Sequence, residues 1–122
     1  MTKAVLRIRR DPERAAREMG KRFATVWKAG RSGAHVFTFE SPAALFRVLT
    51  PKRWELVERL QTLGPSGIRG LARALERDVK RVHDDVVALV DIGLVARTEA
   101  GKVHVPYAVI HADFDLRPAS AA

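Results

Sequence analysis

Residues 77–89, RDVKRVHDDVVAL, bring cationic and acidic side chains together in a stretch that also repeats valine at helical spacing. Arginine and lysine can hydrogen-bond the edge of a guanine or a phosphate, so Arg77, Lys80 and Arg81 could bind nucleic acid. Asp84 could accept a hydrogen bond from the amino group of cytosine, but its charge disfavours a phosphate nearby. The mixture therefore favours the reading of base edges over the binding of phosphate alone. An ordinary solvated helix face is the alternative.

The spacing of the apolar residues predicts which side of this helix is free. An α-helix turns by about 100° per residue, so residues three and four apart share a face. One face carries the expected buried stripe, Val79, Val82, Val86 and Leu89. The opposite face carries Arg77, Lys80, Arg81, Asp84 and Ala88, with His83 at its edge. The basic residues fall in the first turn and a half, the part of a recognition helix that enters the major groove.

The residues before this stretch predict a helix-turn-helix. Thr50 is a suitable N-cap for a helix over TPKRWELVERLQTLG, which Gly64 and Pro65 end. A short helix follows in SGIRGLARALE, and its expected inward residues are Ile68, Leu71, Ala72 and Leu75. A tight turn at Arg77 and Asp78 then leads into the helix that ends at Gly93. Packing of the two apolar faces would leave the second helix as a rod with one face free.

Two alternating runs, LVART and KVHV, come after this helix and predict a β-hairpin. Residues 99–101 separate them as a short loop that contains a glycine. A hairpin that follows a helix-turn-helix is typical of a wing. Its polar side chains Arg97, Lys102 and His104 would contact the flanking phosphates or the minor groove.

The first third of the chain predicts a strand–helix–strand unit. KAVLRIR and HVFTFE have the composition of strands, and a helix begins at Asp11 and Pro12 and ends before AGRSG. Trp27, Phe37 and Phe39 need cover, which favours a role of this unit in dimerisation or partner docking. Two alternatives stay open. One is a solvated helix; the other is contact with the DNA backbone through Arg14, Arg17, Lys21 and Lys28, with Arg7, Arg9 and Arg10 as an arm.

These elements predict an α+β fold in two parts. Residues 1–49 form the strand–helix–strand extension, which a helix over SPAALFRVL completes. Residues 50–122 form a winged helix-turn-helix, and a further strand is expected in AVIHADFDL.

The charge of the chain is consistent with a polyanionic partner. The net charge is +8, and the first 34 residues hold 10 of the 22 basic residues but only 3 of the 14 acidic ones. Such a field attracts nucleic acid, although an arginine-rich composition can also arise from a GC-rich genome without any partner.

No enzymatic activity, cofactor or metal is expected. The four histidines, His35, His83, His104 and His111, have no metal-ligand spacing, and the sequence lacks P-loop, dinucleotide-binding and nucleophile-elbow motifs. The absence of cysteine excludes disulfides and thiolate zinc sites. No apolar run is long enough to span a membrane, and MTKAVLRIRR is too weakly apolar for a secretory signal, so we expect a cytoplasmic protein.

Three segments of the chain resemble a known family. VLTPKRWELVERL, GIRGLARALERDVKRVHDDVVALVDIGLV and GKVHVPYAVIHADFDL are similar to small prokaryotic predicted transcriptional regulators with a MarR-like winged helix, over residues 37–116. The resemblance implies that Ser66–Leu75 is the positioning helix, that Asp78–Ile92 is the recognition helix and that Gly101 lies in the wing turn. Some members are encoded beside toxins and serve as DNA-binding antitoxins. The family commonly has a polar amide in place of Arg81 and a basic residue in place of Asp84, so the resemblance does not imply an operator sequence.

Two functional hypotheses follow from the sequence. The first is a sequence-specific regulator that binds double-stranded DNA and acts as a dimeric autorepressor; the family resemblance alone further implies that it serves as the antitoxin of a toxin–antitoxin pair. The second is a protein-interaction module that holds a toxin or another partner without binding DNA.

Overall fold

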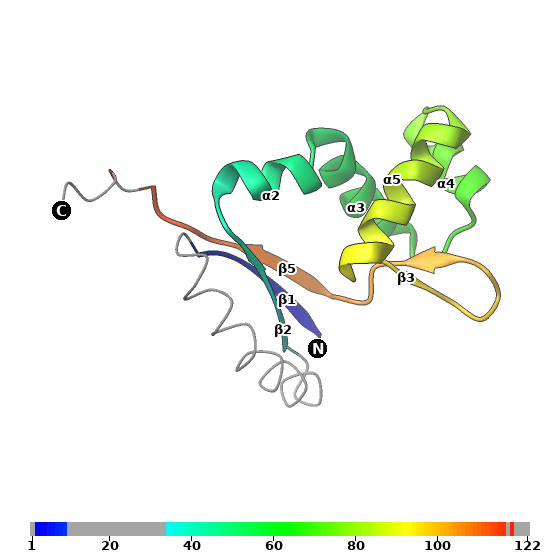
Figure 1. The fold of residues 1–122 in the computed structure, drawn as a ribbon. Coiled ribbons are helices and arrows are strands. Elements are labelled where there is room, and N and C mark those ends of the chain that lie inside the picture. The colour runs from blue at the N-terminus through cyan, green and yellow to red at the C-terminus, as the bar shows by residue number, and fades with distance from the viewer. Residues whose placement is uncertain (1, 10–33, 117, 119–122) are drawn as a thin grey trace.

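The computed structural model describes residues 2–9, 34–116 and 118, and within them the fold is α+β. The elements follow one another as β1 (Lys3–Ile8), β2 (Ala34–Phe39), α2 (Pro42–Val48), α3 (Pro51–Leu63), α4 (Ile68–Leu75), α5 (Val79–Ile92), β3 (Ala96–Arg97), β4 (Val103–His104) and β5 (Val109–Ala112). Figure 1 shows α2 above a three-stranded sheet, with α3, α4, α5 and the β3–β4 pair beyond one end of that sheet. The helix expected near residues 11–29, with its basic face and Trp27, lies outside the described residues.

The sheet joins the two ends of the described chain. Its strand order is β2-β1-β5, and both pairings are parallel. Val5 of β1 lies opposite Val36 of β2 on one side and His111 of β5 on the other. The strand expected in AVIHADFDL is therefore confirmed over Val109–Ala112, where it pairs with a strand of the first third.

Three of the helices begin at the polar residues that cap them. Ser41 Oγ accepts a hydrogen bond from the amide of Ala44 at 3.0 Å, and Thr50 Oγ1 accepts one from the amide of Arg53 at 3.3 Å. Asp78 caps α5 in the same way, through the amide of Arg81 at 3.2 Å. Such caps each contribute about 1 kcal/mol of stability. The predicted helices over SPAALFRVL and TPKRWELVERLQTLG and the helix before Gly93 are confirmed.

Helix α4 begins later than the sequence indicates. The predicted start at Ser66 is wrong, because the backbone of Ser66 pairs with Val103 in an antiparallel bridge, with both N–O distances 2.9 Å. Those two bonds hold Ser66 extended, so the helix starts at Ile68 with Gly67 as a cap that offers no side chain. At its other end, Glu76 adopts the left-handed conformation with φ of 54°, which turns the chain sharply toward α5.

The core is one cluster that draws on both the sheet and the helices. Leu71 and Ala72 of α4 and Val82, Val86 and Leu89 of α5 are buried, as the periodicity predicts. Ala4 and Leu6 of β1 belong to the same cluster.

The predicted burial of Val79 is wrong, because its side chain is 43% exposed. Val79 is the first residue of α5, so α5 has no preceding turn that could cover its side chain.

Aromatic side chains of the sheet find cover within the chain. Phe37 and Phe39 pack against the core cluster, although the sequence suggests that a partner must cover them. The ring of Phe37 meets that of Tyr107 edge-to-face, with centroids 6.0 Å apart. The hydroxyl of Tyr107 donates a hydrogen bond to the carbonyl of Gly93 at 3.3 Å, which ties the end of α5 to the segment before β5. These contacts remove one reason to expect a partner over this surface.

Tyr107 offers a direct test of this packing, because it is the one tyrosine of the chain. Burial raises the pKa of its hydroxyl above 10.0. The unfolded state therefore loses this proton first as the pH rises, and the stability present below pH 10.0 is lost as the pH passes through the higher folded pKa. We expect tyrosinate absorbance to titrate above 10.0 in the folded protein and near 10.0 in urea. Equal midpoints in both states would contradict the buried contact with Phe37 and Gly93.

Among the residues that the structure describes, every helix is too short or too polar to cross a membrane.

Candidate nucleic-acid interface

The N-terminal half of α5 presents a polar face to solvent. Lys80, Arg81, His83 and Asp84 are all exposed. Figure 1 shows this end of α5 directed away from the three-stranded sheet, while its other end returns toward the sheet. Within the described part of the chain, neither Lys80 nor Arg81 pairs with a carboxylate, whereas His83 Nδ1 lies 3.7 Å from Asp84 Oδ1. The face expected from the helical periodicity is therefore accessible at these four positions.

The predicted strand pair after α5 is confirmed, with Ala96 opposite His104 and Arg97 opposite Val103. Its loop closes through three hydrogen bonds between Thr98, Gly101 and Lys102, at 2.8, 3.1 and 3.1 Å. Gly101 has φ of 79°, a conformation that favours glycine. Arg97 and Lys102 are exposed and His104 is half-buried.

The strand pair is also fixed to the start of α4. Val103 forms backbone bonds with Ser66 on the side of β4 that β3 does not occupy. The bridge sets the position of the pair relative to α4 and α5, so Arg97 in β3 and Lys102 next to β4 lie on a supported strand pair rather than on a free arm.

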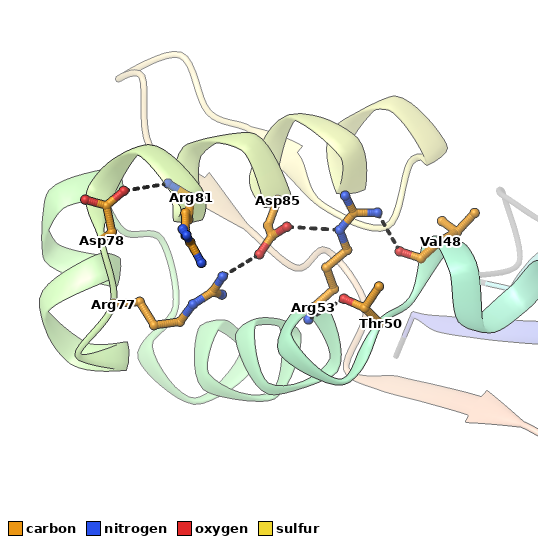
Figure 2. A network of polar contacts seen from close by, with 7 residues as sticks. All are labelled: Val48, Thr50, Arg53, Arg77, Asp78, Arg81 and Asp85. Carbon is orange, nitrogen blue, oxygen red and sulfur yellow. Dashed lines mark hydrogen bonds and ion pairs between the residues drawn. The ribbon is translucent and has the colours of Figure 1, made fainter.

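Arg77 departs from the exposed face that the sequence predicts. Its side chain is only 15% exposed, and its Nη2 donates to Asp85 Oδ2 at 2.8 Å. The other carboxylate oxygen, Asp85 Oδ1, accepts a hydrogen bond from Nε of Arg53 at 3.1 Å. Arg53 Nη1 in turn donates to the carbonyl of Val48 at 2.8 Å (Figure 2). Arg53, Arg77 and Asp85 thus form one ion-pair cluster, called the Asp85 cluster below.

The Asp85 cluster connects three helices and the turn before α5. Val48 ends α2, Arg53 lies in the first turn of α3, and Asp85 lies in the middle of α5. Neighbouring residues on a helix differ in direction by about 100°, so Asp84 is exposed to solvent while Asp85 faces Arg53 of α3 (Figure 2). The cluster therefore holds α5 against α3 at the flank of its exposed face, because Asp85 lies about one helical turn after Arg81.

Sequence reasoning missed Arg53 and Asp85. Arg53 and Asp85 are 32 residues apart, and no local pattern joins positions at that separation. The pairing of Arg77 with Asp85 had no local signal either, because Arg77 lies before α5 and helical spacing does not extend to it.

In the part of the chain that the structure describes, no group of three or more histidine, cysteine or acidic side chains could hold a metal ion.

The comparisons with known proteins give one match. The HVO_A0114 family model matches residues 48–112, which is more than half of the chain. The matched range includes α3, α4, α5, the β3–β4 pair and β5, together with all members of the Asp85 cluster. No curated protein and no solved structure matches the chain.

Proposed function

The chain belongs to the HVO_A0114 family, and we propose that it is a sequence-specific DNA-binding transcriptional regulator. In this proposal α4 and α5 are a helix-turn-helix and the β3–β4 pair is its wing. The observation that carries the proposal is the exposure of Lys80, Arg81 and Asp84 on the outward end of a helix whose opposite face is buried.

The chemistry of this face fits the major groove. A rigid helix of 14 residues can enter the groove, and its first residues reach the base edges. Lys80 and His83 can donate to guanine or to other acceptors at the base edges, and Asp84 can accept from the amino group of cytosine. Arg97 and Lys102 on the wing would lie over the backbone beside the groove, where cations bind phosphate.

The Asp85 cluster gives Arg77 a positioning role in this proposal. Its guanidinium is held by Asp85, so Arg77 is poorly placed to contact a base. We assign it to orienting α5, and we leave base contacts to the residues of the exposed face.

Regulation by a dimer is part of the same proposal. Winged-helix proteins commonly bind two half-sites about 34 Å apart, which the spacing of two recognition helices must match. Autorepression and a role as a MarR-like antitoxin that neutralises a toxin rest on the sequence resemblance alone.

A protein-interaction module is the second candidate, and exposed apolar side chains favour it. Phe46 is 50% exposed and Leu116 is 72% exposed. Phe46 also stacks edge-to-face on Phe114, with centroids 6.4 Å apart. Such side chains suit a protein partner better than DNA.

The double variant Lys80→Ala/Arg81→Ala distinguishes the two candidates. We expect at least a tenfold loss of affinity for a fragment of its own promoter, because each cation contributes on the order of 1 kcal/mol or more to DNA binding. Fluorescence anisotropy measures the affinity, and circular dichroism checks that the fold is intact.

The matched control is Lys3→Ala/Arg7→Ala, which removes the same charge from exposed positions of β1. We expect the control to bind like the wild type. Equal losses in both double variants would mean that overall charge, and not the α5 face, drives binding. Absence of DNA binding by the wild type, together with capture of a toxin, would support the interaction module instead.

A further inference from the structure

A surface hollow of about 580 Å³ lies beside the first turns of α3 and α5. Four charged residues line it, Lys52, Arg77, Asp78 and Arg81. Three of them are cations drawn from separate places, the second residue of α3, the turn after α4 and the third residue of α5. Folding therefore concentrates positive charge that the sequence distributes over 30 positions.

The three cations differ in how they are held. Lys52 and Arg81 are exposed, and neither has a carboxylate partner among the described residues. Arg77 is fixed by Asp85, and its Nη1 is buried without a hydrogen-bond partner in the structure. Figure 2 shows the Arg81 side chain directed from α5 toward the region of the Arg77 guanidinium. Arg77 is paired with Asp85, so the positive charge that an anion in the hollow would neutralise comes chiefly from Lys52 and Arg81.

The helix ends that border the hollow add to this preference. The first turns of α3 and α5 carry partial positive charge, because their first amide groups lack partners within the helix. Arginine offers several donors in a fixed plane, which suits the oxygens of a phosphate. Both features favour a compact, multiply bonding anion over a single carboxylate.

We propose that this hollow binds one phosphate of the DNA backbone, with Lys52 and Arg81 as its ligands and the Arg77 guanidinium, which Asp85 holds in place, adding positive charge at its wall. The inference rests on the proposed function and deepens it, because it assigns to Arg81 a role different from that of the other residues of the exposed face. Lys80, His83 and Asp84 read bases, whereas Arg81 contacts the backbone and fixes the register of α5 on the duplex. Backbone contacts beside the groove position a protein but carry no sequence information of their own.

Asp78 provides a second test of the proposal, because its negative charge repels an anion in the hollow. Its carboxylate lines the hollow and is held in place by the amide of Arg81 at 3.2 Å. Asparagine caps a helix about as well as aspartate, so Asp78→Asn removes the repulsion and keeps the cap. Neutralising Lys52 and neutralising Asp78 are therefore expected to change DNA affinity in opposite directions.

The test measures the affinity of four full-length proteins, the wild type, Lys52→Gln, Asp78→Asn and Lys3→Gln, for the operator and for its single-base variants. We expect Lys52→Gln to weaken binding roughly three- to tenfold on every sequence, and to reduce the slope of log affinity against log salt by about 1. We expect Asp78→Asn to strengthen binding roughly twofold or more, since it removes one repulsive charge near a phosphate. Lys3→Gln makes the same chemical change on the sheet and should match the wild type.

The Arg81→Gln variant, measured on the same operator variants, distinguishes a phosphate ligand from a base reader. A phosphate ligand predicts a uniform loss over all operator variants, whereas a base reader predicts a loss of preference at one position. A change of preference at one position would overturn the assignment of Arg81. If Lys52→Gln matches Lys3→Gln while the wild type binds its operator, the hollow is not a phosphate site but the proposed function stands.

Absence of DNA binding by the wild type would overturn the proposed function and the DNA backbone as the source of the phosphate. Thermal unfolding with inorganic phosphate, at constant ionic strength set with chloride, then decides the chemistry of the hollow. Greater stabilisation of the wild type than of Lys52→Gln would support a site for a free phosphate group. Equal responses would overturn the hollow as a phosphate site altogether.

Discussion

An Asp85→Ala variant is expected to lose about 2–3 kcal/mol of its free energy of unfolding. The substitution leaves Arg53 and Arg77 without their shared carboxylate, and their side chains are only 23% and 15% exposed. Removing one partner of a buried ion pair costs more than the pair contributes, because the remaining charge is left desolvated. The remaining exposure of the three side chains places the loss below that of a fully buried pair. Urea unfolding followed by circular dichroism measures it.

Asp84→Ala is the matched control for this prediction. Asp84 is the adjacent residue, but its side chain is 68% exposed, and its carboxylate lies 3.7 Å from Nδ1 of His83. Exposed pairs contribute little, so we expect its free energy of unfolding to stay within about 0.5 kcal/mol of the wild type. Equal losses in the two variants would mean that the Asp85 cluster does not stabilise the fold. A loss confined to Asp85→Ala, together with weaker operator binding in conditions where the variant stays folded, would support its role in orienting α5.

Sequence predicted the elements of this fold wherever neighbouring residues decide the structure. Ser41, Thr50 and Asp78 each cap a helix with a side chain that reaches an amide three residues away. Gly101 closes the hairpin through a backbone conformation that glycine adopts easily. The helix caps and the glycine turn each depend on residues only a few positions apart, so the local sequence is enough to predict them.

Contacts between distant segments account for the misplaced start of α4, because Ser66 pairs with Val103, 37 positions further along the chain. The pairing of β5 with β1 likewise joins the two ends of the described chain, and no local pattern predicts it. Helical periodicity identifies a face but does not say which neighbour lies against it.

The residues of the candidate site also differ in how well the sequence predicts their exposure. Lys80, Arg81 and Asp84 lie within α5, so a rotation of about 100° per residue predicts their exposure. Arg77 lies before the helix, where the left-handed turn at Glu76 and the cap at Asp78 set its direction. The helical rotation does not apply there, which is why the sequence placed Arg77 on the exposed face.

The affinity for DNA should fall steeply as salt is added. Each phosphate that the protein neutralises releases condensed counterions, so log affinity declines with log salt at a slope of about −0.9 per phosphate. Suppose that the hollow and the wing residues Arg97 and Lys102 neutralise about three phosphates per protomer. A rise from about 50 to 200 mM salt then lowers the affinity of one protomer about 40-fold, and that of a dimer on two half-sites about 2 × 10³-fold.

The slope of log affinity against log salt therefore tests two points together, the contacts with the DNA backbone and the number of protomers on the DNA. It is measured by anisotropy titration of a labelled operator at several chloride concentrations, with the operator shortened to one half-site as the control. A dimer predicts that the full operator gives about twice the slope of the half-site, because twice as many phosphates are covered. Equal slopes would indicate a monomer on DNA, and a slope near zero would exclude the proposed backbone contacts. The net charge of +8 does not by itself produce the doubling, because that charge is the same on both fragments.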